Sequence, residues 1–130
     1  MVATLSITTR NRSEMIDITS RVQEEVDKSG IKDGVCFLFV PHTTAGITIN
    51  EGADPSVVTD IQSMLNKLVP WEGSYRHLEG NSAAHIKTSL IGQSTIVLVE
   101  SGRLKLGTWQ AIFFCEFDGP RTRKVHIKFQ

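Results

Sequence analysis

Cysteine is scarce in this sequence, and long hydrophobic runs are absent. The two cysteines, Cys36 and Cys115, each lie inside an apolar, strand-like run. This placement favours buried, reduced thiols over a disulfide or a redox pair. No apolar stretch approaches the roughly 20 residues of a membrane span. No basic segment followed by an apolar block marks a signal peptide either. We therefore expect a cytoplasmic protein without a membrane partner.

An excess of charge of one sign is also missing. Fourteen basic residues balance fourteen acidic residues, and the sequence pI is about 6.9. Such a balance gives no overall attraction to nucleic acid, so we expect no nucleic-acid partner. It also gives little self-repulsion against association into oligomers. The length of 130 residues and the hydrophobic share of 40% predict a single globular domain over residues 1–130.

Three widespread catalytic motifs are lacking as well. The sequence has no Walker loop, no GxGxxG and no GxSxG. It therefore gives no support to an NTPase, a Rossmann enzyme or a serine hydrolase. What the chain does have is polar residues gathered at the ends of its apolar segments, where binding and catalytic sites are often built.

Alternation of apolar and polar residues predicts most of the strands. Residues 3–8 alternate as in a half-buried strand, and residues 15–18 are expected to return beside them as a hairpin. Residues 35–40 are apolar at every position, which predicts a strand covered on both faces. Further strands are predicted at residues 47–49, 95–99, 109–117 and 123–129, the last two joined by a turn at 118–120.

Two main helices and one short helical piece complete the expected fold. Ser20 and Gln23 match a capping box at the start of the first helix. Asp54 as N-cap and Pro55 at the first helical position begin the second helix. A short helical piece is expected within residues 82–90. The sum is an α+β fold, with a mostly antiparallel sheet in two packed layers.

One stretch concentrates polar chemistry between a buried strand and a helix start. A histidine, two hydroxyls, an amide and two carboxylates lie there. A hydrophobic core does not need such polar groups, so they indicate a binding or catalytic site. These residues are His42, Thr43, Thr44, Asn50, Glu51 and Asp54. Asp54 serves first as a helix cap, while Glu51 is either a solvated charge or a partner that orients a histidine. His42, Glu51 and Asp54 are the candidate catalytic residues, because a carboxylate near an imidazole suits acid–base chemistry.

Three of the four histidines are candidate metal ligands. His77 and His85 lie eight residues apart across a polar loop, and His42 lies at the end of a strand. Three neutral imidazoles can hold a zinc-like divalent ion and leave a fourth position open. Their spacing matches no established metal motif, so separate structural roles remain open. His126 alternates with lysines and is expected on an exposed face.

Several segments have the chemistry of an anion-binding site. Hydroxyls and backbone N–H groups after a strand can bind phosphate, and guanidiniums beside a tight turn can bind it through two bonds. A charged hairpin turn is the plain alternative for the arginines. The candidate substrate-binding residues are Thr43, Thr44, Asn50, Asn81, Gly107, Thr108, Trp109, Gln110, Arg121 and Arg123.

These motifs, taken together, resemble the YjbQ family. The matching pieces run in order along nearly the whole chain. They are residues 41–45, Asn50-Glu51 with Asp54-Pro55, His77 through Gly80-Asn81 to His85, Ser94 through Gly102 to residues 107–110, and residues 118–121.

The resemblance implies a compact, β-sandwich-like α+β fold that assembles as a homotrimer. It also implies a metal on His42, His77 and His85, and a secondary thiamine-phosphate synthase activity. That reaction joins a pyrimidine pyrophosphate to a thiazole phosphate and releases pyrophosphate. Three histidines favour zinc, whereas pyrophosphate chemistry often uses magnesium with oxygen ligands, so both metals stay open.

Three functional hypotheses follow from the sequence. The first is a metal-dependent enzyme acting on a small phosphorylated molecule, with thiamine-phosphate formation as the leading reaction. The second is metal-assisted hydrolysis, in which a metal-activated water attacks the substrate. The third is a non-catalytic trimer that binds or senses a ligand in the same pocket.

Overall fold

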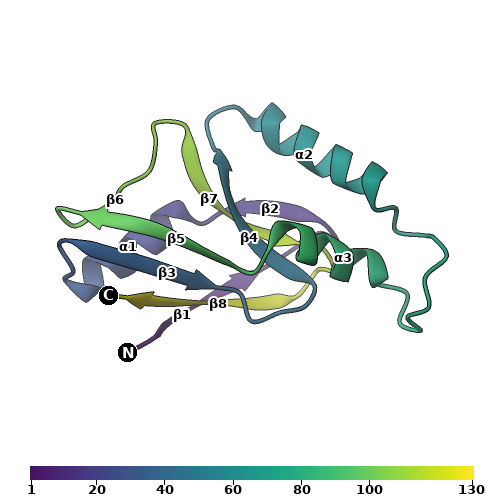
Figure 1. The fold of residues 1–130 in the computed structure, drawn as a ribbon, viewed down its shortest axis with the longest axis horizontal. Coiled ribbons are helices and arrows are strands. Elements are labelled where there is room, and N and C mark those ends of the chain that lie inside the picture. The colour runs from purple at the N-terminus through teal and green to yellow at the C-terminus, as the bar shows by residue number, and fades with distance from the viewer.

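A computed structural model describes all residues, 1–130, as eight strands and three helices (Figure 1). The strands are β1 (Ala3–Thr8), β2 (Glu14–Asp17), β3 (Gly34–Phe39), β4 (Ala45–Glu51), β5 (Ser94–Glu100), β6 (Arg103–Leu104), β7 (Gln110–Glu116) and β8 (Thr122–Phe129). The helices are α1 (Thr19–Ser29), α2 (Pro55–Leu68) and α3 (Ser82–Ile91). The predicted α+β class is confirmed, and α3 is a full third helix rather than a short piece.

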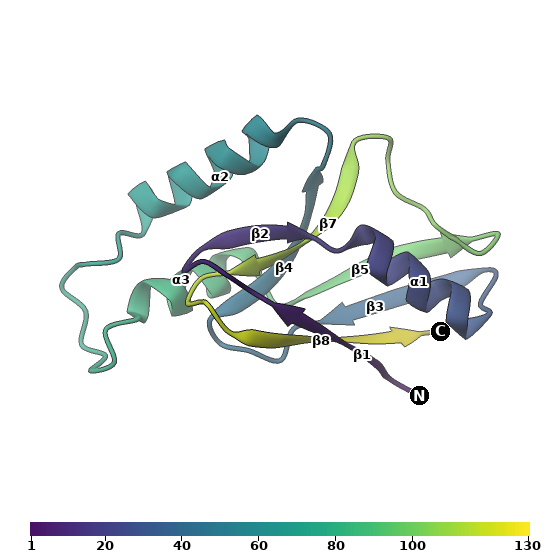
Figure 2. The same cartoon turned by 180° about the vertical axis from the view of Figure 1, so that it is seen from behind.

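The strands form two antiparallel sheets. The larger sheet has five strands in the order β1-β8-β3-β5-β6, and the smaller has three in the order β2-β7-β4. The main core lies between the two sheets and α1, because alternate residues of both sheets point into it. Seen from behind, α1 lies beside the larger sheet, at the end of the molecule where both chain termini also lie (Figure 2). The fully buried side chains of this core include Ile7, Ile18, Val22, Leu38, Ile47, Ile112, Phe114 and Ile127.

A second, smaller core covers the other face of the three-stranded sheet. Its buried members are Ala84, Ala111, Phe113, Cys115 and Phe117. Helices α2 and α3 lie over this face, but α2 has no buried residue at all. Figure 1 shows α2 standing off the body of the molecule. Its apolar stripe is therefore only partly covered within one chain.

Two expected hairpins are wrong. Strand β2 pairs with β7 instead of returning along β1, because residues 9–13 carry the chain from one sheet to the other. Strand β8 likewise pairs with β1 and β3, so the turn at residues 118–120 also crosses between sheets. The turn residues at each place indicated that the chain reverses within one sheet. Which strand pairs with which depends instead on the apolar faces that share the core, and these come from residues far apart in sequence.

The expected capping box is also wrong. Helix α1 has Ile18 at its N-cap and no side-chain cap bond, so Ser20 lies inside the helix. Asp17 instead accepts hydrogen bonds from the Thr19 N–H at 2.9 Å and from the Thr19 hydroxyl at 2.6 Å. The start of α2 is confirmed, because Asp54 caps it through a 2.9 Å bond from the Ser56 N–H, with Pro55 next.

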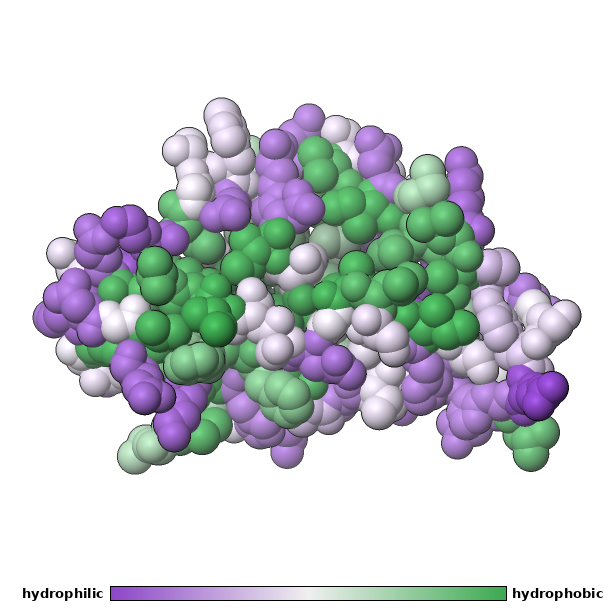
Figure 3. Space-filling model, in the orientation of Figure 1, coloured by the Kyte–Doolittle hydropathy of each residue, from purple (hydrophilic) through white to green (hydrophobic).

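The run at residues 35–40 is covered on only one face, contrary to expectation. Cys36, Leu38 and Val40 are buried. The intervening Phe37 and Phe39 are 39% and 51% exposed. On the neighbouring β5, Ile96 and Leu98 are each 57% exposed, and Ile96 pairs directly with Phe37. Figure 3 shows apolar surface over β3, β5 and α3 on this side of the molecule.

None of the three helices is long and apolar enough to cross a membrane.

A close approach of backbones joins α3 to the smaller sheet. The Ile47 N–H donates to the Gly92 carbonyl at 3.0 Å, directly after α3 ends. A Cβ built on Gly46 would lie 2.5 Å from the same carbonyl oxygen. No ordinary side chain fits there, so glycine at position 46 lets α3 lie against β4.

Replacing Gly46 by alanine should lower the melting temperature by several degrees. The added methyl group forces β4 and the end of α3 apart, and such overpacking costs about 1–3 kcal/mol. Differential scanning calorimetry measures the change. Gly80→Asn is the control, because Gly80 has φ +74° with no atom within 4 Å of its Cβ position, and asparagine tolerates this conformation. Equal melting temperatures for Gly46→Ala and the wild-type chain would contradict the prediction.

Candidate functional site

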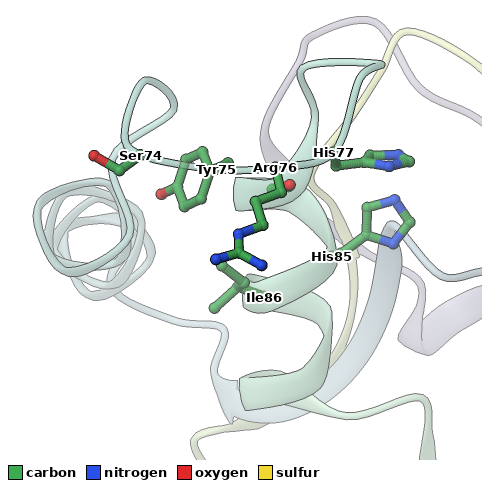
Figure 4. A pocket seen from close by; sticks show the side chains of 7 residues that line it. Ser74, Tyr75, Arg76, His77, His85 and Ile86 are labelled. Carbon is green, nitrogen blue, oxygen red and sulfur yellow. The ribbon is translucent and has the colours of Figure 1, made fainter.

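His77 and His85 face each other in a pocket between the α2–α3 connection and α3. Their ring centroids are 5.3 Å apart, and the rings meet edge to face at 89°. His77 lies on the connection, and His85 lies on the second turn of α3. Figure 4 shows both rings at one side of the pocket, with Arg76 beside them. The pocket has a volume of about 530 Å³ and is lined by Ser74, Tyr75, Arg76, His77, Ser82, His85 and Ile86.

Arg76 is a pocket residue that the sequence reasoning missed. Its guanidinium extends toward Ile86, across the pocket from the two histidine rings (Figure 4). Arg76 takes part in no ion pair of the chain, so its five N–H donors are available to a ligand. Its position directly before a candidate histidine in a polar loop is the sequence signal that could have identified it.

The N-terminus of α3 is tied to the turn after β7. Asn81, at the N-cap of α3, donates its side-chain amide to Asp118 Oδ2 at 2.8 Å. Arg121 donates to the same oxygen at 2.9 Å and to the Asp118 carbonyl at 2.8 Å. The structure therefore brings Asn81 and Arg121 together through one carboxylate. Arg121 is still half-exposed, so part of its guanidinium faces solvent.

His42 lies near Arg121 and Arg123, but its ring already accepts a hydrogen bond. Its Nε2 accepts a 3.0 Å hydrogen bond from the Lys124 backbone N–H. A neutral imidazole has one nitrogen that accepts, so the proton of His42 sits on Nδ1. Burial lowers the pKa of His42, and the charge of Arg123 lowers it further. His42 is thus a neutral Nδ1–H donor, with no free lone pair for a metal in this conformation.

A buried ion pair, Glu116 with Arg123, lies close enough to His42 to influence its pKa. Arg123 is 4% exposed and Glu116 is 0% exposed. Arg123 donates to both carboxylate oxygens of Glu116, from Nε at 2.8 Å and from a terminal nitrogen at 2.5 Å. It also donates to the Thr44 hydroxyl at 2.8 Å, while the Thr9 hydroxyl donates to Glu116 at 2.7 Å. Arg123 and Thr44 therefore stabilise the fold here and are not exposed anion contacts.

Glu116 was missed because the five residues before it in its strand, 111–115, are all apolar. Burial alone would raise the pKa of this carboxyl, but hydrogen bonds from Arg123, Thr9 and the Asp118 N–H, with the Arg123 charge, together lower it. The group is therefore ionised in the folded chain. A carboxylate at the end of a buried strand, seven residues before an arginine, is the sequence signal for the pair.

A second group of candidate residues lies at the opposite end of β4. Glu51 Oε2 accepts the Asp54 N–H at 3.0 Å, and Asn50 Oδ1 accepts the Glu51 N–H at 2.8 Å. Hydrogen bonds from the Ser56 N–H and hydroxyl lower the pKa of Asp54, in keeping with its capping role. Gln110 closes the adjoining loop, because its side chain accepts the Gly107 N–H at 2.8 Å. Thr108 and Trp109 are exposed in that loop.

Strand β4 separates the two groups of candidates. It pairs Ala45 with Glu116 at one end and Glu51 with Gln110 at the other. Six residue steps at about 3.3 Å each place the two ends roughly 20 Å apart. One chain therefore does not gather all the candidate residues into a single pocket. Thr43, Asn81 and Arg121 lie with His42, whereas Asn50, Glu51 and residues 107–110 lie far from it.

The three histidines do not converge within one chain. No group of three or more His, Cys, Asp or Glu side chains is placed to hold a metal ion. The nearest acidic partner of the pair is Glu79, whose Oε2 lies 3.8 Å from His77 Nε2. His77 and His85 supply two imidazoles, one fewer than a zinc site with an open position uses. The residues of a single chain therefore do not complete the expected zinc site.

The chain is similar to proteins of one family over nearly its whole length. The family model described as "UPF0047 protein YjbQ-like" matches residues 3–130. UPF0047 protein YugU of Bacillus subtilis is 55% identical over 129 residues, covering 98% of each chain. UPF0047 protein MJ1081 of Methanocaldococcus jannaschii is 51% identical, covering 98% of this chain and 93% of its own.

Solved structures agree with this similarity. An uncharacterized conserved YjbQ/UPF0047-family protein from Clostridium acetobutylicum has a TM-score of 0.96 at 55% identity, covering 98% of this chain and 99% of its own. A YbjQ-like protein of unknown function from Sulfolobus solfataricus has a TM-score of 0.94 at 34% identity, covering 99% and 95%. The names of these relatives give a family and no reaction.

Replacing Glu116 by glutamine should destabilise the chain by about 3–5 kcal/mol at pH 7, because it leaves the Arg123 charge buried and unpaired. The folded pKa of Glu116 is lowered, so the pair stabilises the wild-type chain above the ordinary carboxyl pKa of 4.5. This stability is lost as the pH falls through the lowered pKa. Urea unfolding at pH 7 and at lower pH measures the difference, which should shrink in acid.

The double variant Glu116→Gln with Arg123→Gln is the matched control. It removes both charges and keeps polar groups at both positions, so it should recover most of the lost stability. A single variant as stable as the wild-type chain at pH 7 would show that the ion pair contributes nothing.

Proposed function

The chain belongs to the YjbQ-like UPF0047 family. We propose that it is an enzyme acting on a small phosphorylated molecule. The observation that carries the proposal is the pocket where the His77 and His85 rings stand 5.3 Å apart beside Arg76. Two imidazoles and a free guanidinium in a concave site combine proton transfer with anion binding. A purely structural loop needs none of the three.

The histidine pair supplies the acid–base groups. Imidazole is the side chain best suited to exchange protons near neutral pH. With the rings edge to face, one can donate a proton to a substrate bound beside the pair while the other accepts one from it. Arg76 places positive charge in the same pocket, where it can stabilise the negative charge that a phosphate oxygen gains as a bond to phosphorus or to a leaving pyrophosphate breaks.

Arg121, Thr43 and His42 make a second anion contact near the N-terminus of α3. Arg121 is half-exposed, Thr43 is exposed and His42 offers its Nδ1–H. Asp118 links Arg121 to Asn81, which lies four residues before His85 on the same helix. We therefore assign phosphate binding to this group and chemistry to the histidine pair.

A divalent metal on His77 and His85 is part of the proposal. When bound, it would act as a Lewis acid on a phosphate oxygen. Because one chain offers two imidazoles, the remaining ligands would come from the substrate or from a second copy of the chain. A zinc-like ion suits imidazole ligands best, while magnesium would bind mainly through phosphate oxygens.

Thiamine-phosphate formation is the leading specific reaction. It needs positive charge for the departing pyrophosphate, which Arg76 and Arg121 can supply. Trp109 offers a flat, 64% exposed ring for a heteroaromatic substrate, but it lies at the far end of β4. It could therefore reach the histidine pocket only from a neighbouring copy. Metal-assisted hydrolysis and ligand sensing remain the alternatives.

A homotrimer accounts for two features that a single chain leaves unexplained. Phe37, Phe39, Ile96 and Leu98 form an exposed apolar face on β3 and β5, which we call the apolar sheet face. Helix α2 likewise buries no residue within one chain. Contact with a second copy covers apolar surface of this kind. It can also bring the Glu51 and Trp109 end of one chain to the histidine pocket of the next.

A cytoplasmic setting fits the two thiols. Cys36 and Cys115 are both free and buried, and burial raises the pKa of each to about 12. Such thiols are inert, and they need no oxidising compartment.

Replacing His77 or His85 by alanine should abolish activity and metal binding together. Purified protein without a histidine tag should contain about one divalent metal per chain by elemental analysis. Product formation from the two phosphorylated precursors should fall about 10²–10⁴-fold in each variant. His126→Ala is the control, because His126 lies on the β8 strand and bonds only to the Thr4 hydroxyl at 2.9 Å.

The outcomes separate the parts of the proposal. If the wild-type chain contains no metal but its turnover still depends on the histidines, the acid–base part of the proposal holds and the metal part is wrong. If the wild-type chain forms no more thiamine phosphate than His77→Ala does, the synthase reaction is wrong and hydrolysis becomes the leading reaction. Thermal stabilisation by a phosphorylated ligand without any turnover would favour a sensor.

Replacing Ile96 by lysine should break the assembly. A charge in the middle of the apolar sheet face cannot be buried against another copy without a large cost. Light scattering coupled to size exclusion should give three times the chain mass for the wild type and a smaller mass for the variant. Val2→Lys, at an exposed residue just before the edge strand β1, is the control and should stay trimeric. A monomeric mass for the wild-type chain would contradict the proposed homotrimer.

A further inference from the structure

A second polar pocket lies on the other side of α3 from the histidine pair. It has a volume of about 300 Å³ and is lined by Arg12, Ser13, Asn66, Trp71 and Lys87. Lys87 follows His85 by two residues, which is about 200° around a helix. The two residues therefore serve different pockets. None of the five lining residues is among those that build the histidine pocket.

Lys87 is a buried cation without an acidic partner. It is 2% exposed and belongs to none of the ion pairs of the chain. Its Nζ donates one hydrogen bond, to Asn66 Oδ1 at 2.5 Å, and lies 6.0 Å from the centre of the Phe117 ring. An ammonium group has three donors, so two remain without a protein acceptor. Burial lowers the pKa of Lys87, and the charge of Arg12 lowers it further.

Arg12 is held at the same pocket by its surroundings. Its guanidinium carbon lies 4.2 Å from the centre of the Trp71 ring, over the ring. This cation–π contact holds the guanidinium in place. The Arg12 carbonyl accepts the Gly119 N–H at 3.0 Å, which anchors the backbone. The guanidinium makes no ion pair, so its N–H donors are free.

No carboxylate neutralises these two charges. The five lining residues include none. Glu14 lines an adjoining narrow crevice with Lys87, but its Oε2 already accepts the backbone N–H groups of Arg10 and Asn11 at 2.6 and 2.8 Å. Two like charges at one pocket repel each other, and one of them is also deprived of water. An arrangement of this kind is destabilising for the chain alone and favourable for an anion that enters it.

We propose that this pocket, Lys87 with Arg12, Ser13 and Asn66, binds a small oxyanion of the phosphate class. The anion accepts from the two unused donors of Lys87 and from the guanidinium of Arg12, and the Ser13 hydroxyl and the Asn66 amide complete its shell. Guanidinium and ammonium groups are the usual partners of phosphate oxygens in proteins. The volume suits inorganic phosphate or the phosphate group of a small monoester.

The anion would join four separate segments of the chain. Lys87 lies on α3, Asn66 on α2, Arg12 on the β1–β2 connection and Trp71 at the start of the loop that carries His77. Occupancy of this pocket therefore fixes α2 and the α2–α3 loop against the body. Neither the metal nor the chemistry assigned to His77 and His85 is required for this binding.

Isothermal titration with inorganic phosphate, at constant ionic strength kept by chloride, tests the site in the full-length protein. Phosphate should bind the wild-type chain, and binding through the Lys87 pocket should weaken at least 10-fold in Lys87→Met and in Arg12→Gln. Arg121→Gln and His85→Asn are the matched controls. They alter the site of the proposed function and should keep this binding.

Folding is checked on the same samples. Lys87→Met replaces a buried charge with an apolar side chain of similar length, so its melting temperature without phosphate should equal or exceed that of the wild type. In the Arg121→Gln background, phosphate should raise the melting temperature, and adding Lys87→Met to that background should remove the rise.

Two results would overturn the assignment. One is phosphate binding by Arg121→Gln that survives when Lys87→Met or Arg12→Gln is added to it, because Arg121→Gln already removes the phosphate contact of the proposed function. The other is a wild-type chain that phosphate neither binds nor stabilises beyond the chloride control. If Lys87→Met is less stable than the wild type without phosphate, the titration of Arg12→Gln, whose side chain is exposed, decides alone.

Discussion

The buried pair of Glu116 and Arg123 is the interaction on which the candidate site depends. Glu116 ends β7 of the smaller sheet, and Arg123 begins β8 of the larger one, so the pair joins the two layers where the chain passes between them. The Thr9 hydroxyl at the end of β1 and the Thr44 hydroxyl before β4 complete its hydrogen bonds. Three connections between the sheets, β1–β2, β3–β4 and β7–β8, thus meet at one ion pair. The His42 ring and the Arg121 turn take their positions from this junction, because each lies within two residues of a member of it.

Much of the fold could be predicted from local patterns. The alternation in residues 3–8, the apolar run after Gly34 and the Asp54-Pro55 helix start all describe what the structure contains. These features depend on neighbours in sequence, so a sequence records them directly. The pairing of β2 with β7 depends on which faces share a core. Residues 9–13 and 118–120 look like hairpin turns because nothing local distinguishes a reversal within a sheet from a passage between sheets.

The candidate site was predicted only in part, for a related reason. His77 and His85 lie together because a loop and one helical turn separate them, and eight residues suffice for that. His42 was expected beside them, but its lone pair is taken by the Lys124 N–H, a contact 82 residues away in sequence. Glu51 and Trp109 were expected there too, and the length of β4 keeps them away. Lys87 was not considered, because a lysine in an amphipathic helix is normally solvated, and only the packing of α2 and Phe117 shows that it is buried.

Helix α2 has a consequence for how the chain opens. It contributes no buried side chain, and only the loops at its two ends connect it to the rest of the chain. The free energy that detaches it is therefore much smaller than the free energy that unfolds the two sheets. Detachment of α2 with both sheets intact is therefore the opening that this fold predicts to cost least, and it would expose the ammonium of Lys87 to water. Whatever holds α2 in place, whether a bound ion or a neighbouring chain, sets the population of the detached form without touching the main core.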